Sequence, residues 1–553
     1  MSLSVVFAVI IFLIIIFACG YRNEKAKLRQ SLDEKLASYG QVNRRRFNAR
    51  DLEHISSYEQ RHKSEGRLDD TTWNDLDMWS VFGRMDYCIS SAGDEYLYYM
   101  LRNPKEDPDE LKRLEELLTR LDENDSQRNA FIKALMYMGR FNGRSIYEYT
   151  DRIKELKDFD CRGDIVLDVL LLLGIVICAF KPLLGVLLLV VLIVWGILTY
   201  FKKKNIVGSY IACFEYIFRL SKAADNLASL DFEGYEAIGR LKEMNKTIGR
   251  IEKCAGPLKD LGSGNPLSIV FDYIKMITHV DFIIFSRVLG EMKECLDDID
   301  SIIECVGSID ACISIASYRR YVGSFARPVF TEDIRYKAKE IYHPLLEKPV
   351  ANDLDTVKPI LLTGSNASGK STFLKTLALN AILAQSINTV FAAGYEAPIC
   401  RVITSLNIKD SLSAGESYYM AEINSMKRIL DAAKESEVPV FAFVDEILRG
   451  TNTTERIAAG SHILYSMSGL NTLVFAATHD LELTSILEGV YEDYYFLEML
   501  EGADVAFPYK MEKGVASSKN AIKLLRFKGY DETTADKAAR MAEHFEKTGV
   551  WTL

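Results

Sequence analysis

The stretch LLTGSNASGKSTFLKTLA, residues 361–378, contains a short apolar run, a glycine-rich turn and the start of a helix. The turn matches the pattern G-x-x-x-x-G-K-[ST], which requires a strand before it and a helix after it. Backbone N–H groups of such a loop converge on phosphate oxygens. The stretch therefore predicts a P-loop site for ATP and Mg²⁺ at the edge of an α/β sheet.

The loop and the first helical turn supply the expected phosphate contacts. Lys370 would place a positive charge on the β- and γ-phosphates, and the Ser371 hydroxyl would be one ligand of Mg²⁺. The expected nucleotide-binding residues here are Gly364, Ser365, Asn366, Ala367, Ser368, Gly369, Lys370, Ser371 and Thr372.

Two further apolar strands end in groups that complete such a site. VPVFAFVDEI (438–447) ends in Asp445, expected to hold the metal through water, and Glu446, expected to orient and deprotonate the attacking water. TLVFAATHD (472–480) places His479 at the same sheet edge. Paired acids or a lone histidine after a strand are common, but three strand ends with complementary groups favour catalysis by Lys370, Glu446 and His479.

The block from Ile341 to about Phe545 resembles the ATPase domain of the MutS family of DNA mismatch repair proteins. The extension DEIxRGT and the segment ending at Glu422 separate it from generic P-loop proteins and from transporter ATPases. Nearer the start of the chain, TWNDLDMWSVFGRM (72–85) resembles the beginning of the helical core of that family. The four matching motifs are TGSNASGKST (363–372), KDSLSAGESYYMAE (409–422), DEILRGTNT (445–453) and ATH (477–479).

This resemblance implies an ABC-type P-loop domain that works as a symmetric or near-symmetric homodimer. Ser413, Gly415 and Ser417 of one subunit would then complete the nucleotide site of the other, whereas the alternative is a surface segment without a partner role. Relatives stack an aromatic residue on adenine shortly before the P-loop, where this chain has Pro349-Val350. Tyr509 is therefore the expected partner on the other face of the base.

Two regions are apolar enough to enter a bilayer. The run Leu3–Ala18 has no charge and precedes basic residues, as in an uncleaved anchor whose C-terminal flank stays in the cytoplasm. The run Ile165–Phe201 contains only Asp168 and Lys181 as charged residues, and Lys181-Pro182 interrupts it. Two short spans joined by a tight turn fit this run best. A re-entrant hairpin and a buried hairpin in a soluble core are the alternatives.

Together these regions predict three spans per subunit. Lys202, Lys203 and Lys204 follow the second region, so the positive-inside rule returns the chain to the cytoplasm. We therefore expect a multi-pass protein of the cell membrane with a cytoplasmic ATPase domain. Its expected parts are an anchor (1–20), a helical region (21–163), a membrane hairpin (164–201), an all-α core or lever region (202–340) and the ATPase domain (341–553).

The overall charge limits the partners. A formal charge of -10 argues against broad adhesion to nucleic acid and leaves local basic patches, such as NRRRFNAR (43–50), as phosphate contacts. That run near an anchor is more often a topology signal or a solvated face. The ten cysteines are scattered singly, which indicates a reducing compartment and no structural zinc.

Two functions remain open at this point. In the first, a membrane-anchored MutS-like ATPase engages DNA during mismatch repair or recombination. We do not expect base-specific mismatch recognition, because too little chain precedes residue 70 for the mismatch-reading domain of the family. In the second, ATP drives a mechanical switch that acts on the membrane or on protein partners without DNA. A basic lining of the helical arms would favour the first function, and an acidic or apolar lining the second.

Overall fold

The structure is a computed structural model, and it describes residues 22–23, 25–42, 45, 47–64, 66–141, 145–155, 159–230, 236–254, 273–365, 368–406, 418–496, 499–501, 504–515 and 529–552. The chain forms two compact units. Unit 1 consists of Met1–His62, Met85–Tyr99 and Leu117–Tyr321, and unit 2 consists of Lys63–Arg84, Met100–Glu116 and Val322–Leu553.

Unit 1 is helical wherever the structure describes it. Its core is α15, in which every residue from Cys305 to Arg319 is buried. Gly307 lets the Ala92 carbonyl approach, because a Cβ there would come within 2.6 Å of that oxygen. The helices of this unit include α2 (Ala49–Ile55), α3 (Ser57–Arg61), α6 (Ser91–Arg102), α8 (Asp125–Met138), α9 (Ile146–Glu155), α10 (Arg162–Phe180), α11 (Pro182–Ala228), α12 (Glu236–Cys254), α14 (Val280–Glu294) and α15 (Leu296–Val322).

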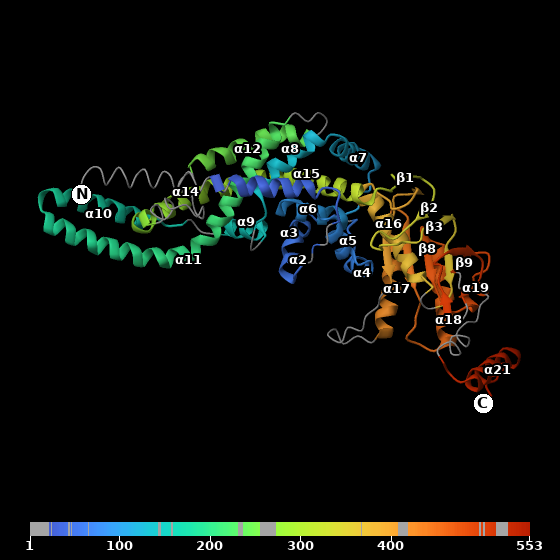
Figure 1. The fold of residues 1–553 in the computed structure, drawn as a ribbon. Coiled ribbons are helices and arrows are strands. Elements are labelled where there is room, and N and C mark those ends of the chain that lie inside the picture. The colour runs from blue at the N-terminus through green and yellow to red at the C-terminus, as the bar shows by residue number, and fades with distance from the viewer. Residues whose placement is uncertain are drawn as a thin grey trace. The chain divides into compact units, whose positions relative to one another are not determined.

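Helices α10 and α11 form the hairpin predicted for residues 165–201, and they run side by side (Figure 1). The turn lies at Lys181, and Pro182 opens the second helix, a position where the missing N–H of proline costs no hydrogen bond. Among the described residues, two helical segments are long and apolar enough to cross a membrane, Arg162–Phe180 and Pro182–Lys204. The predicted anchor at residues 1–20 lies outside the described residues.

Apolar side chains of this hairpin point outward. Phe180 and Leu183 are 82% and 89% exposed, and 22% of the most apolar window of each segment is buried. A hairpin in a soluble core would have the opposite pattern, with its apolar side chains covered. In this structure most of these side chains are uncovered, and the membrane hairpin and its alternatives stay predictions.

Polar side chains gather instead at the base of the hairpin. Lys203 Nζ lies 2.6 Å from Asp164 Oδ2, and the other oxygen of this carboxylate lies 2.8 Å from His279 Nδ1. His279 Nε2 lies 2.8 Å from the Gly196 carbonyl oxygen. Because α11 continues without a break to Ala228, the boundary predicted at residues 201/202 does not interrupt the secondary structure.

Unit 2 contains two main sheets. The six-stranded sheet has the order β12-β9-β4-β8-β7-β6, with β12 antiparallel to β9 and the other pairs parallel, and the four-stranded sheet has the order β1-β5-β2-β3. The strands are β1 (Val329–Phe330), β2 (Tyr336–Ile341), β3 (Asn352–Thr356), β4 (Ile360–Thr363), β5 (Gly394–Ala397), β6 (Arg401–Ser405), β7 (Val440–Asp445), β8 (Thr472–Ala477), β9 (Glu492–Phe496), β10 (Met499–Glu501), β11 (Asp504–Ala506) and β12 (Met511–Lys513).

Helices cover both faces of the six-stranded sheet (Figure 1). On one face, Val440, Ala442 and Val444 of β7 join a core with side chains of α17 and α18. On the other face, Phe443 stacks on Phe475, and the Tyr336 hydroxyl donates to the Leu377 carbonyl of α16. The helices that begin in unit 2 are α4 (Asp70–Asp75), α5 (Met78–Met85), α7 (Pro108–Glu123), α16 (Lys370–Ile387), α17 (Tyr418–Glu435), α18 (Thr453–Ser468), α19 (Glu482–Ile486) and α21 (Glu532–Thr548).

The boundaries of unit 2 differ from those predicted. Residues 63–84 and 100–116, assigned above to a separate helical region, group with the ATPase sheets, and the first strand begins at Val329 rather than after Ile341. The physical reason is polar pairing with β6. Asp75 Oδ2 accepts hydrogen bonds from Thr404 Oγ1 at 2.7 Å and from the Leu406 N–H at 2.9 Å.

Candidate functional site: a P-loop at the carboxyl ends of parallel strands

The P-loop follows the fully buried strand β4, as predicted. Gly364 and Gly369 have φ angles of +140° and +110°, which side chains with a Cβ rarely adopt. At Gly369 a Cβ would also come within 3.1 Å of the Tyr509 ring. Helix α16 begins at Lys370, so its N-terminal N–H groups lie at the loop. Asn366 and Ala367 lie outside the described residues.

Lys370 is buried at the centre of this site. Its Nζ donates to the carbonyl oxygens of Gly364 at 2.8 Å and Ser365 at 2.9 Å, and lies 3.4 Å from His479 Nε2. The Ser368 hydroxyl beside it is buried without a hydrogen-bond partner among the described residues. A buried orphan hydroxyl and a buried ammonium group at one glycine-rich loop fit a polyanionic ligand such as a nucleotide phosphate.

The two residues predicted to bind the metal lie together at the second strand end. The Ser371 hydroxyl hydrogen-bonds to the Asp445 carboxylate at the end of β7. Burial raises the pKa of Asp445, and the nearby Glu446 charge adds to that effect, while the Ser371 hydrogen bond lowers it. Asp445 Oδ1 is buried without a partner among the described residues. A hydroxyl and a carboxylate are ligands that Mg²⁺ prefers, so these two residues fit the metal.

Glu446 and His479 meet at the same edge. Glu446 Oε1 lies 3.1 Å from His479 Nε2, and the other carboxylate oxygen contacts Arg449 Nε. Burial alone would raise the pKa of Glu446, but hydrogen bonds from His479 and Arg449 lower it to about 2. The carboxylate is therefore ionised at neutral pH, the state that a general base requires.

Strand register brings these groups together. Asp445 pairs with Ala477 across β7 and β8, and the Glu446 N–H donates to the Ala477 carbonyl at 2.9 Å. The Thr478 N–H donates to the Leu362 carbonyl of β4 at 3.0 Å. Three parallel strands thus end side by side, which brings His479 into contact with both Lys370 and Glu446.

A cavity of about 320 Å³ adjoins the P-loop. Tyr509, which is half exposed and has a φ of +54°, lines it together with Val350, as expected for a site that holds the base. Asn352 fixes this arrangement, because its side-chain amide donates to the Tyr509 carbonyl at 3.0 Å and its oxygen accepts from the Met511 N–H at 2.9 Å. The predicted Tyr509 contact therefore has a matching pocket.

Some residues of the site were not predicted. His343 and Phe496 also line this cavity, and burial lowers the pKa of His343 to about 4, so its imidazole is neutral at pH 7. His343 lies outside the motifs described above, and Phe496 ends β9, a strand that carries none of those motifs. The predicted partner contacts Ser413, Gly415 and Ser417 lie outside the described residues, and that prediction stays open.

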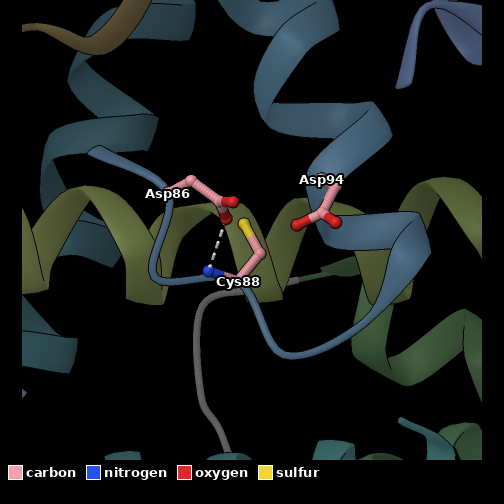
Figure 2. Close-up of side chains that lie close together, drawn as sticks. All are labelled: Asp86, Cys88 and Asp94. Carbon is pink, nitrogen blue, oxygen red and sulfur yellow. Dashed lines mark hydrogen bonds between the residues drawn. The ribbon is translucent and has the colours of Figure 1, made fainter. Parts of the chain in front are cut away.

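Unit 1 contains a group of side chains that resembles a metal site. Single ligand atoms from Asp86, Cys88 and Asp94 lie within 4.8 Å of one another (Figure 2). However, Arg45 Nη1 lies 2.8 Å from both carboxylates, and Arg140 lies 3.0 Å from Asp94. Burial also raises the pKa of the Cys88 thiol well above its usual value, which disfavours the thiolate that a metal needs. We interpret this group as a buried ion-pair network.

Comparison with known proteins gives a consistent result. The family model for MutS domain V matches residues 360–546. DNA mismatch repair protein MutS from Listeria welshimeri is 29% identical over 293 residues, which cover 50% of this chain and 33% of that protein. DNA mismatch repair protein MutS from Thermosipho melanesiensis is 30% identical over 274 residues, which cover 47% of this chain and 32% of that protein.

The matches cover only part of this chain and part of each relative. The chain spans about a third of the length of the curated relatives it matches. MutS domain V is the P-loop ATPase domain of the family, and the matched residues include β4, β7 and β8 with the side chains of Lys370, Asp445, Glu446 and His479. The comparisons therefore support a MutS-family protein, in which residues 360–546 match the model of MutS domain V.

Proposed function

We propose that this protein binds and hydrolyses ATP at the P-loop site. The observation that carries the proposal is the meeting of Lys370, Glu446 and His479 at three adjacent strand ends, with Nζ to Nε2 and Nε2 to Oε1 distances of 3.4 and 3.1 Å. Lys370 binds phosphate, Glu446 accepts a proton from the attacking water, and His479 orients the Glu446 carboxylate. When bound at Ser371 and Asp445, Mg²⁺ supplies charge neutralisation.

Steady-state ATP hydrolysis by the detergent-purified chain tests this proposal. Glu446→Gln should lower kcat at least 100-fold, because removal of a general base typically costs 10²- to 10⁴-fold. Asp431→Asn is the matched control, since Asp431 is an exposed carboxylate on α17. Equal rates for the wild type and Glu446→Gln would reject the assignment of the base.

We further propose that two copies form the working ATPase. The resemblance of residues 409–422 to the family signature supports a contact between Ser413, Gly415 and Ser417 of one subunit and the nucleotide of the other. Mixing two inactive variants, Lys370→Ala and Ser413→Ala with Ser417→Ala, tests it. Activity in the mixture that neither variant has alone is the expected result, because one site of the mixed dimer is intact. No recovery in heterodimers verified by mass would contradict it.

The hairpin supports a membrane location, with the ATPase domain on the cytoplasmic side. Its outward apolar side chains, among them Leu183 and Leu187, suit a lipid environment. Wild-type chain should float with vesicles of phosphatidylcholine and phosphatidylglycerol at 3:1. Leu183→Arg with Leu187→Arg should reduce flotation, because each arginine costs about 2.5–3.5 kcal/mol in a spanning helix. Unchanged flotation of the double variant would contradict insertion of this hairpin.

Two actions for the ATPase remain as proposals. Engagement of DNA is supported by the relatives, which are named DNA mismatch repair proteins. A switch that acts on the membrane is supported by the contacts that tie the hairpin base to His279 at the start of α14. A groove of about 820 Å³ in unit 1 favours neither action, because it is lined by acidic and basic residues, among them Arg61 paired with Asp151.

Adding DNA to the hydrolysis assay separates these two actions. Homoduplex, mismatched and branched DNA should each be tested at several salt concentrations, because phosphate contacts weaken steeply with salt. Several-fold stimulation that salt weakens supports DNA engagement, and the preferred structure identifies the substrate. Hydrolysis that responds to vesicles but to none of the DNA structures supports the membrane switch.

A further inference from the structure

The loop after β7 has an unusual backbone. Glu446 and Leu448 both have a φ of +55°, although neither is a glycine. A non-glycine residue in this region costs on the order of 1 kcal/mol, and it persists only where the surroundings hold it. Because Glu446 is the proposed base, whatever holds this loop also sets the position of the carboxylate.

The carboxylate of Glu422 on α17 is one such support. Glu422 is 2% exposed, and its two oxygens accept hydrogen bonds from the backbone N–H groups of Arg449 at 3.1 Å and Gly450 at 3.0 Å. The Arg449 side chain in turn contacts the Glu446 carboxylate. Because one buried side chain accepts from two successive backbone N–H groups, Glu422 holds the loop that carries Glu446.

The second support is a close fit between Ile447 and α18. Ile447 is buried, and a Cβ added at Gly460 would come within 2.8 Å of its Cγ2 atom. Glycine at this position therefore makes room for the loop. The fit lies on a different helix from Glu422, so each support can be changed separately.

Helix α17 is itself fixed in its second half. Arg428 Nη1 lies 2.5 Å from Asp69 Oδ2, and the same guanidinium contacts the Thr404 carbonyl of β6. The helix begins at Tyr418, directly after the segment that contains the proposed partner contacts Ser413 and Ser417. Glu422 thus lies one turn into a helix that joins this segment to the loop of the proposed base.

We propose that Glu422 is a positioning residue for Glu446. This inference rests on the proposed ATPase function, in which Glu446 is the base. Glu422 contacts the backbone of residues 449 and 450, so it acts through the loop and not on the nucleotide. Its loss should slow the chemical step while leaving ATP binding intact.

The test compares variants of the full chain in detergent. Glu422→Gln keeps the shape of the side chain but offers one acceptor oxygen in place of two, so it should lower kcat at least tenfold with KM for ATP within twofold. Gly460→Ala pushes on Ile447 without touching Glu422 and should give the same pattern. Asp431→Asn on the same helix should match the wild type. The Kd of a non-hydrolysable ATP analogue should stay within twofold for all variants.

The outcomes separate this inference from the proposed function. If Glu446→Gln is inactive but Glu422→Gln and Gly460→Ala keep kcat within twofold, the positioning role is wrong and the base assignment stands. A parallel loss of kcat and analogue binding in Glu422→Gln also overturns it, because that pattern indicates general disruption. If Glu446→Gln hydrolyses ATP like the wild type, both the base assignment and the positioning role fail.

Discussion

The hairpin of unit 1 and the central strands of unit 2 have similarly apolar sequences, but the hairpin exposes its apolar side chains and the strands bury theirs. Strands β4, β7 and β8 are covered on both faces, and their polar groups lie at the strand ends, where they form the site. Helices α10 and α11 expose their apolar side chains and gather polar ones at the base. An apolar run therefore indicates burial in protein or contact with lipid only once its coverage is known.

The largest expected difference between the two regions is in stability. Phe443→Ala should destabilise unit 2 by about 3–5 kcal/mol, because Phe443 is fully buried and stacks on Phe475. Leu187→Ala in the hairpin should change the stability by less than about 1 kcal/mol in detergent, because Leu187 is exposed. Urea unfolding of the full chain in detergent, followed by circular dichroism, measures both. Equal losses of stability in the two variants would show that burial of the apolar side chains does not distinguish the regions.

Asp164→Ala tests whether polar pairing stabilises the hairpin base. The change leaves Lys203 and His279 without the carboxylate they share, so the free energy of unfolding of unit 1 should fall by about 3–5 kcal/mol. Asp160→Asn is the control, since Asp160 is exposed on the same segment. The site in unit 2 should keep its affinity for an ATP analogue. A loss of unfolding free energy no larger than that of Asp160→Asn would contradict a stabilising role for this pairing.

Lys370→Ala tests whether the P-loop binds nucleotide phosphate. Loss of a charged donor to phosphate should weaken binding of a non-hydrolysable ATP analogue by roughly 10- to 100-fold, since hydrogen bonds to charged groups contribute about 1.5–3 kcal/mol. The exposed Lys427 provides the control Lys427→Ala. Calorimetry measures both affinities. Unchanged affinity in Lys370→Ala would show that the loop does not bind nucleotide phosphate.

The pH dependence of stability tests the Glu446 environment and should give the smallest effect. The pKa of Glu446 is lowered to about 2 in the folded protein, against about 4.3 in an unfolded chain. Its pairing with His479 and Arg449 thus contributes stability above about pH 4.3, which is lost as the pH falls toward 2. The difference in urea midpoint between the wild type and Glu446→Gln should shrink over that range. A difference in urea midpoint that grows as the pH falls would contradict a lowered pKa of Glu446 in the folded protein.

Local patterns predicted the parts of the site that depend on neighbouring residues. The P-loop, the ends of β7 and β8, and the turn at Lys181 each follow from a short stretch with its own geometry. The meeting of Glu446 and His479 also followed, because parallel strands end at one edge. The anchor and the signature residues lie outside the described residues, so those predictions stay open.

Contacts between distant parts of the chain were beyond these patterns. Asp75 joins β6 although more than 300 residues separate them, and Glu422 caps a loop that begins two dozen residues later. Neither contact leaves a periodic or compositional signal, because each depends on the tertiary packing of its helix. The same holds for His343 and Asn352, whose roles become visible only once the cavity is formed.

The central claim is that Glu446 and His479 act together in one ATPase site, and a double-mutant cycle tests it most directly. Steady-state kcat should be measured for the wild type, Glu446→Gln, His479→Asn and the double variant. Residues that act as a unit give non-additive losses, so we expect the double variant to be no more than threefold slower than Glu446→Gln. Losses that multiply, with the double variant slower by the product of the two single effects, would contradict a shared site.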